Sequence, residues 1–349
     1  MKKTKKLLAC LIAAATMFTM GSTAFAAEAG KVQTPENAGT VTFTKEYNLE
    51  GSGSSPAETF TFEVEGVGVT DAGDGVTIGT YGFPIVGGAE YGVGDAGSHN
   101  KDKTVSVKLP EYKSVGVFTY KISEVATTNT AGVTYDSIPV YMKVTVVNDD
   151  VNGGVKIAAV TFRKGADQTD KKIDNNAPAF TNKYSANSLP VKKVVTGNLG
   201  DKSKFFNVTV TLTNSTGKEM SSDISYAVGD KTTTIKASEW KNNEAEAVIQ
   251  LKDGQTITFT NLPFGVTYKV TEADYTAKEN GGYDAPSYEY KKADRTVNVE
   301  DQNVTITNNK GGDIDTGVNL TTLPYILVFA GVIVIAGVAF ITRRRKFED

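Results

Sequence analysis

Two short segments of this chain repeat one another, and the repetition limits the fold more than any other feature. The segment YKISE occupies residues 120–124, and YKVTE occupies residues 268–272. Each segment alternates its residues with the period of two that is typical of a β-strand. The carboxylate that ends each segment, Glu124 or Glu272, therefore shares a strand face with two apolar side chains.

The repeat extends over the whole body of the chain. Each half opens with a lysine-bearing strand and closes with an asparagine-bearing strand. The segments are VTFTKEY at 41–47 and LPVKKVV at 189–195 for the openings, and PAFTNKY at 178–184 and NVTITNNK at 303–310 for the closings. The distance from Lys45 to Glu124 is 79 positions, and so is the distance from Lys193 to Glu272. The sequence therefore indicates two copies of one domain plan.

The fold class follows from the strand pattern. Thr, Val, Tyr, Phe and Gly dominate, and no long helical period occurs before the C-terminal apolar segment. We predict an all-β chain with two tandem Ig-like β-sandwich domains, at residues 41–185 and 186–310. The turn-forming residues of YSANSLP, at 184–190, predict a short link between the two domains.

The N-terminal segment has the pattern of an export signal. A basic start is followed by an apolar run and a small-residue site at Ala24-Phe25-Ala26, which predicts a signal peptide over residues 1–26. Residues 27–40 then form a polar leader. Because Cys10 is the only cysteine, the mature chain has none and cannot use disulfides.

The C-terminal segment, residues 311–349, has the pattern of a cell-wall sorting signal. The apolar stretch at 323–341 is long enough to span a bilayer, and the basic tail at 342–349 places the bulk of the chain outside the cell. Without the signal peptide and the residues after Thr316, 29 basic and 38 acidic residues remain, a net charge of −9. That acidic balance excludes nucleic acid as an expected partner.

Strand parity selects three polar residues in each half that point toward apolar surroundings. They are Lys45, Glu124 and Asn182 in the first half, and Lys193, Glu272 and Asn308 in the second. Lys192 and Asn309 fall on the opposite faces and are the poorer alternatives. Burial of such groups is costly unless they neutralise each other or react.

Reaction is the interpretation that the residue types favour. A lysine in an apolar pocket loses its proton more easily and becomes a nucleophilic amine. A buried glutamic acid keeps its proton and can polarise the asparagine carbonyl by hydrogen bonding. Attack by the amine and loss of ammonia would join the first strand to the last through an amide. The alternative is an ordinary buried ion pair.

The chain resembles the two-domain major pilins of Gram-positive bacteria, whose Ig-like (CnaB-type) domains contain intramolecular Lys–Asn isopeptide bonds. The segments at 188–212 and 251–275 and the two asparagine strands carry this resemblance. It implies bonds from Lys45 to Asn182 and from Lys193 to Asn308, with Glu124 and Glu272 as the proton donors. It also implies a secreted, wall-anchored pilus backbone subunit that is not an enzyme.

The resemblance assigns a role to the segment ahead of the apolar stretch. A sortase cleaves between Thr and Gly of an LPxTG-like pentapeptide and passes the Thr carbonyl to an amine. Residues 313–317, DIDTG, hold that place, so Thr316 is the expected acyl donor and Gly317 the residue released. The proline usual in the family is missing, so either a pilin sortase or a housekeeping sortase is expected to read it.

Polymerisation also needs an acceptor lysine. The pilin motif YPKN is absent. In the resembling pilins the acceptor precedes the asparagine of the first domain, which implies Lys172, and then Lys171. The expected partners are other copies of the chain, the sortases, peptidoglycan and minor pilins or an adhesin.

Other functions find little support in the sequence. His99 is the only histidine, so neither a catalytic triad nor a zinc site can be assembled, and we expect no cofactor or metal. The alternative function is a wall-anchored adhesin of the same architecture that binds a host ligand and is never polymerised.

Overall fold

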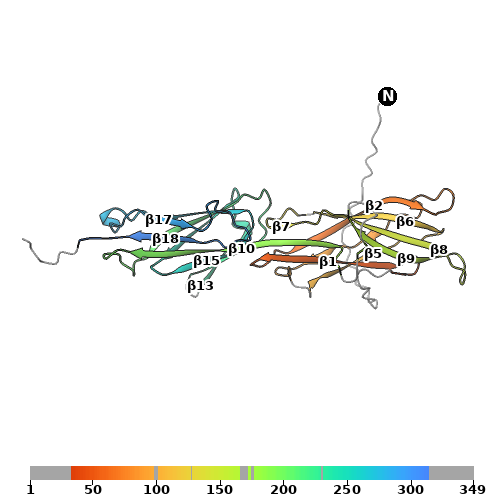
Figure 1. Cartoon of the computed structure of the whole chain (residues 1–349), viewed down its shortest axis with the longest axis horizontal. Coiled ribbons are helices and arrows are strands. Elements are labelled where there is room, and N and C mark those ends of the chain that lie inside the picture. The colour runs from red at the N-terminus through yellow and green to blue at the C-terminus, as the bar shows by residue number, and fades with distance from the viewer. Residues whose placement is uncertain are drawn as a thin grey trace, which may run out of the picture.

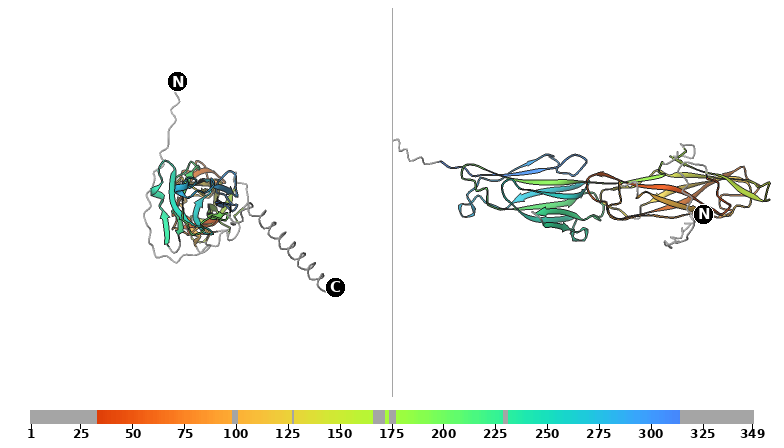
Figure 2. Two further views of the ribbon diagram at one scale, coloured as in Figure 1. Left: turned by 90° about the vertical axis from the view of Figure 1, so that its left-hand side faces the viewer. Right: turned by 90° about the horizontal axis from the view of Figure 1, so that it is seen from below.

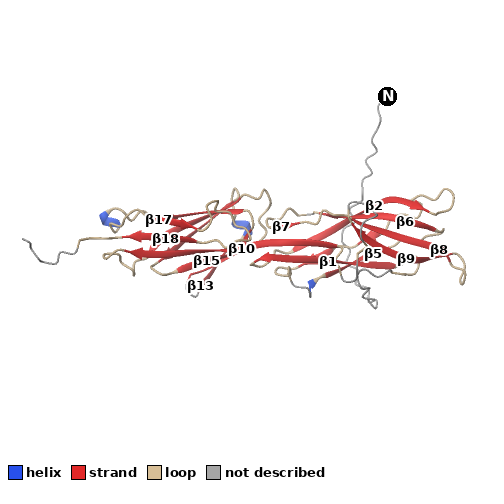
Figure 3. Ribbon diagram, viewed as in Figure 1, coloured by secondary structure: helices blue, strands red, loops and turns tan. Residues whose placement is uncertain are grey.

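The computed structural model describes residues 33–97, 101–126, 128–165, 172–173, 177–228 and 231–313. They form two strand-rich bodies arranged end to end (Figures 1 and 3). Viewed along the long axis, the two bodies overlap in one compact outline (Figure 2). Helical structure within these residues consists of short 3₁₀ turns such as η2 (Ala237–Glu239) and η3 (Lys278–Asn280). The predicted all-β fold class is confirmed.

The predicted signal peptide and membrane span, residues 1–26 and 323–341, lie outside the described residues, as do residues 27–32 of the predicted leader. Within the described ranges, no helix has the length and apolar character needed to cross a membrane.

The first domain is a sandwich of two sheets. Its strands are β1 (Thr40–Gly51), β2 (Glu58–Thr70), β3 (Ile85–Val86), β4 (Ala89–Tyr91), β5 (Lys103–Lys108), β6 (Gly116–Val125), β7 (Val133–Thr134), β8 (Val140–Asn148), β9 (Val155–Lys164) and the first part of β10 (Phe180–Thr196). One sheet has the order β10-β1-β5-β3, and the facing sheet has the order β4-β2-β6-β8-β9.

The second domain repeats this plan. Its strands are the second part of β10, β11 (Phe206–Asn214), β12 (Ile224–Val228), β13 (Lys231–Ile235), β14 (Glu244–Leu251), β15 (Thr256–Pro263), β16 (Val266–Glu272), β17 (Ser287–Tyr290) and β18 (Val304–Asn309). One sheet has the order β13-β12-β15-β10-β18-β17, and the other has the order β14-β11-β16.

In both domains the closing strand lies parallel to the opening strand and beside it. In the first domain Tyr47 of β1 is opposite Asn182 of β10. In the second domain Val195 of β10 is opposite Asn308 of β18. Each asparagine is thus paired with the residue two positions after the lysine, Lys45 or Lys193. Because residues two apart share a face, this register brings lysine and asparagine side chains together.

The predicted turn-rich link at 184–190 is wrong, because β10 runs through it as one strand of 17 residues (Figure 1). The irregularity is confined to a register shift against β15 between Asn187 and Leu189. Lys193 N–H donates to Gln255 O, so the odd-numbered amides here face β15. Pro190 therefore faces the other side, where pairing with β18 begins only at Val191. The missing N–H of this proline costs no ladder hydrogen bond.

Loops on either side of β10 also join the domains. Ala131 N–H donates to Glu219 O at 2.8 Å, and Glu219 N–H donates to Asn129 O at 2.7 Å. Asn261 of β15 accepts from Ser54 N–H of the first domain at 3.0 Å. These contacts tie the two domains together at several points around the strand.

Each domain has its own apolar core. Strand β14 shows the pattern plainly, because its residues alternate between exposed and buried along its whole length. Two separate large clusters of buried apolar side chains result, one before and one after the middle of β10.

Candidate functional site

The first domain brings Lys45, Glu124 and Asn182 together in its interior. Lys45 lies on β1 between Phe43 and Tyr47, which share its buried face. Glu124 is near the end of β6, in the facing sheet, and Asn182 is on β10. The lysine and the asparagine thus come from neighbouring strands, and the glutamate reaches them across the sandwich.

In this first set, Glu124 contacts both the lysine and the asparagine. Lys45 Nζ lies 3.0 Å from Glu124 Oε2, with side-chain exposures of 0% and 1%. Asn182 Nδ2 donates to Glu124 Oε1. Lys45 Nζ also lies 4.5 Å from the centre of the Phe60 ring. No solvent reaches these groups, so each must interact with the others.

The second domain assembles the equivalent set. Lys193 Nζ lies 3.3 Å from Glu272 Oε2, and both side chains are fully buried. Lys193 Nζ donates to Asn308 Oδ1. The centre of the Phe206 ring lies 4.4 Å from the same nitrogen, as Phe60 does in the first domain.

The two residues that strand parity rejected, Lys192 and Asn309, lie outside the buried sets. Lys192 is exposed. Asn309 is exposed too, and its side chain donates to Asp284 Oδ2 at 2.6 Å instead of approaching a lysine. The positions chosen by strand parity are therefore the ones that the fold brings together.

Burial changes the ionisation of both sets. It lowers the pKa of Lys45 to about 8, although the nearby Glu124 carboxylate acts in the opposite direction. It raises the pKa of Glu124 despite the lysine beside it. The pKa of Lys193 is lowered and that of Glu272 is raised, again by burial. Both shifts favour the neutral amine and the neutral acid.

These sets can support amide formation without any further group. Transfer of a proton from the lysine ammonium to the carboxylate gives an amine and a carboxylic acid. The amine can then form a bond to the asparagine Cγ while the bond from Cγ to Nδ2 breaks. The nitrogen leaves as ammonia, and the glutamic acid stays neutral. The dry, preorganised setting supplies the proximity that this reaction needs.

Two features of the sites were missed by sequence reasoning. The Phe60 and Phe206 rings beside the lysines belong to the aromatic strands β2 and β11. These strands hold equivalent places in the two halves, so the repeat could have predicted that each contributes a ring beside a lysine. Asp136, whose N–H donates to Asn182 Oδ1 at 2.9 Å, has no counterpart in the repeat that would have marked it.

The predicted polymerisation residues are only partly described. Lys172 is half-buried and pairs with Arg163 near the end of β9. Arg163 is at the end of β9 opposite to the hairpin turn at 149–154, and that turn lies at the outer end of the first domain (Figure 1). Lys171, Thr316 and Gly317 lie outside the described residues.

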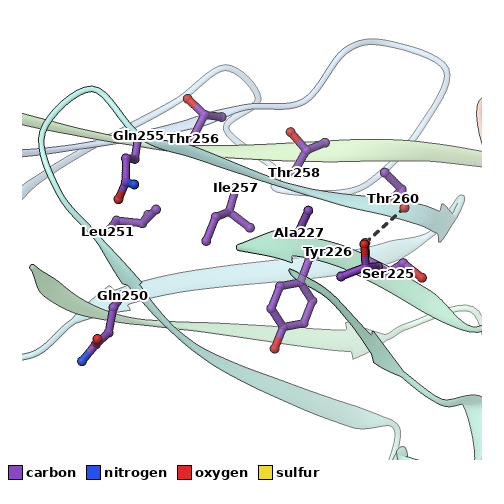
Figure 4. A pocket seen from close by; sticks show the side chains of 11 residues that line it. Ser225, Tyr226, Ala227, Gln250, Leu251, Gln255, Thr256, Ile257, Thr258 and Thr260 are labelled. Carbon is purple, nitrogen blue, oxygen red and sulfur yellow. Dashed lines mark hydrogen bonds between the residues drawn. The ribbon is translucent and has the colours of Figure 1, made fainter. Parts of the chain in front are cut away.

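An open groove in the second domain is separate from both sets. Its walls come from β12, β15 and the end of β14, with Tyr226, Gln250 and Thr258 among them (Figure 4). Thr260 donates to Ser225 O at its rim. The walls carry hydroxyl and amide groups with no acid or amine, so the groove has no part in the amide chemistry. No group of three potential metal ligands occurs in the described ranges.

Comparison with known proteins identifies the class of protein. Residues 41–185 match the family described as Spy0128-like isopeptide containing domain, and residues 187–310 match a domain family of unknown function, DUF7601. Over 93% of its length the chain is 28% identical to a protein named "Pilin" from Streptococcus pyogenes serotype M1, of which it covers 96%. The chain is thus similar to a streptococcal pilin along nearly its whole length, and its first domain matches an isopeptide-containing domain family.

Two other similarities complete the comparison. A protein named "Pilus tip adhesin Cpa" from Streptococcus pyogenes is 33% identical over 137 residues, which are 38% of this chain and 18% of that protein. The crystal structure of the major pilin from Streptococcus pyogenes aligns with a TM-score of 0.48 at 24% identity. That alignment covers 79% of this chain and all of the other chain.

Proposed function

We propose that this chain is the backbone subunit of a covalently polymerised cell-surface pilus of a Gram-positive bacterium. The similarity to a streptococcal pilin along nearly the whole of both chains carries this conclusion. Its partners are other pilin subunits and a tip adhesin. The adhesin alternative is weaker, because the likeness to the tip adhesin involves only 18% of that protein.

The subunit is stabilised, in this proposal, by two internal isopeptide bonds. Lys45 is joined to Asn182 with Glu124 as proton donor, and Lys193 is joined to Asn308 with Glu272 as proton donor. The contacts within each buried set support this chemistry. Each bond ties the opening strand of a domain to its closing strand.

Assembly proceeds through the sorting signal. A pilin sortase cleaves between Thr316 and Gly317 and transfers the Thr316 carbonyl to Lys172 of the next subunit, with Lys171 as the alternative acceptor. A housekeeping sortase then attaches the finished polymer to peptidoglycan. The sequence order of pentapeptide, apolar segment and basic tail supports this route.

A blot of wall material released by muramidase and boiled in SDS tests the proposal. We expect a ladder of very large species, because covalent polymers resist boiling. The ladder should collapse when Lys172 and Lys171 are both replaced by alanine. Lys156→Ala, at an exposed lysine at the other end of β9, is the matched control and should leave the ladder intact.

Other outcomes separate the alternatives. A single band near the monomer mass would overturn the polymer and favour the anchored adhesin. A ladder that persists in the double variant would keep the pilus and exclude both lysines as the acceptor.

A further inference from the structure

The carboxamide of Asn182 is held at both of its ends in the first domain. Its nitrogen, Nδ2, donates to Glu124 Oε1. Its oxygen, Oδ1, accepts a hydrogen bond from the backbone N–H of Asp136 at 2.9 Å. The amide is therefore fixed in one orientation, and Asn182 is fully buried there.

Asp136 is itself anchored by its side chain. Its carboxylate accepts from Thr181 N–H at 2.9 Å and from Ile138 N–H at 3.1 Å. Lys164 Nζ lies 2.5 Å from the same carboxylate. These contacts fix the segment after β7 against the start of β10, so the Asp136 N–H points at Asn182 before any reaction.

Glu124 has no oxygen directed at the Asn182 carbonyl. One of its oxygens contacts Lys45 Nζ and the other accepts from Asn182 Nδ2. Both contacts are to nitrogens, the entering one and the leaving one. The structure thus differs from the expectation that the glutamic acid polarises the carbonyl, and the carbonyl oxygen needs another donor.

We propose that the backbone N–H of Asp136 stabilises the negative charge that develops on Asn182 Oδ1 when Lys45 attacks. This inference rests on the proposed isopeptide bond. Lys45 gives one proton to Glu124 and forms the bond to Cγ, and negative charge collects on Oδ1 at the Asp136 N–H. As that charge returns to the carbonyl, the bond from Cγ to Nδ2 breaks. Nδ2 takes the proton held by Glu124 and leaves as ammonia, and Glu124 takes one proton from the attacking nitrogen and so ends protonated.

The second domain offers an internal comparison. There Asn308 Oδ1 accepts from Lys193 Nζ, the entering nitrogen, where Asn182 Oδ1 accepts from a backbone N–H. The device we propose therefore belongs to the first domain. The bond of the second domain serves as a control within each molecule.

Removal of this single N–H is the sharpest test. Cell-free translation with malic acid at position 136 keeps the side chain and replaces the amide N–H by an ester oxygen. The rate of formation of the peptide pair joined through Lys45 and Asn182, followed by mass spectrometry of digests, should fall about 100-fold or more, as when an oxyanion donor is lost. The Lys193–Asn308 pair should form at the normal rate. Malic acid at Asp150, in an exposed turn, is the matched control.

The outcomes are distinguishable. A Lys45–Asn182 bond that forms within twofold of the normal rate in the ester variant overturns this inference and leaves the isopeptide proposal intact. Absence of both bonds from the unaltered protein overturns both. Should the ester variant fail to fold, a through-hydrogen-bond NMR coupling between the Asp136 nitrogen and Asn182 Cγ in the unaltered protein decides, and its absence contradicts the proposal.

Discussion

At the scale of single residues, the buried sets gain from reacting. An unreacted set holds a lysine and a glutamate without access to water, and such a pair recovers its desolvation cost only with excellent geometry. The product holds a neutral amide and a neutral acid, which remain buried at much lower cost. The same burial that makes the ion pair expensive therefore favours the cross-link.

Asn308→Ala should remove one cross-link and weaken the second domain. The intact mass of the unaltered protein should lie below the sequence mass by about 17 Da for each bond, one ammonia each, and the variant should lack one of these losses. Positions 193 and 308 are 115 apart, so the free energy of unfolding of this domain should fall by roughly 5 kcal/mol, as for a comparable loop-closing cross-link. Asn309→Ala, at the exposed neighbour, should keep both losses, and the reverse pattern would contradict the assignment.

The rate of bond formation in the first domain should depend on pH as a bell. The reactive form, a neutral amine beside a neutral acid, holds one titratable proton, and so does the ion pair. The rate should therefore follow the fraction of molecules in which the Lys45–Glu124 pair carries one proton. In acid, below the raised pKa of Glu124, a second proton occupies the pair and the rate falls. Above the Lys45 pKa of about 8 the pair loses its proton and has no acid for the leaving nitrogen.

This profile can be measured on unlinked chain kept unfolded in urea and diluted into buffers across the pH range. Mass spectrometry of the Lys45–Asn182 peptide pair gives the rate. A rate that rises steadily to high pH would show that the glutamate proton is not needed.

At the scale of elements, the sequence predicted which residues face the core better than where the strands end. Period-two alternation places Lys193 inward and Lys192 outward, and the structure agrees, because the pleat obeys that period strictly. The segment at 184–190 was predicted as a turn because Asn, Ser and Pro favour turns. Tertiary context reverses that preference, since Asn187 uses its side chain to bond both domains at the bulge. Asp136 could not be predicted, because its role depends on a backbone amide that any residue except proline provides.

Asn187→Ala should loosen the junction between the domains. Its Nδ2 donates to Asn298 O at 3.1 Å, and its Oδ1 accepts from Ser52 Oγ of the first domain at 3.2 Å. Ser52 is exposed and Asn298 is half-buried, so loss of these bonds should cost about 0.5–1.5 kcal/mol each. Residues 27–349 contain no cysteine, so spin labels can be placed cleanly at Val151 and Val248, which are both exposed.

The distribution of distances between these labels should broaden in Asn187→Ala. Lys192→Ala, at an exposed position on the same strand, should leave it unchanged. An equally narrow distribution in both variants would mean that the remaining contacts around β10 hold the domains without Asn187.

At the scale of the whole molecule, β10 connects the two ends of the proposed load path. With Lys172 as acceptor, tension enters at position 172, reaches Asn182 ten positions later, and follows β10 to Lys193. It then crosses the amide to Asn308 and leaves toward Thr316. Neither sandwich core lies in series with this path, because the chain from 194 to 307 is bypassed and the chain before 172 is a side branch. The two cross-links therefore have different mechanical roles.

Force spectroscopy with attachment through cysteines at positions 172 and 316 can separate these roles. The unaltered protein should show no unfolding step, because the path is short and covalent. Asn308→Ala should show a step of about 400 Å, since the 115 positions from Lys193 to Asn308 become extensible. Asn182→Ala should show none, because its bond lies off the path. Attachment at position 40 instead of 172 should reveal a step in Asn182→Ala, since the first domain then lies in series. If Asn182→Ala also showed no step with attachment at position 40, Asn182 would not be the residue that joins the opening and closing strands of the first domain.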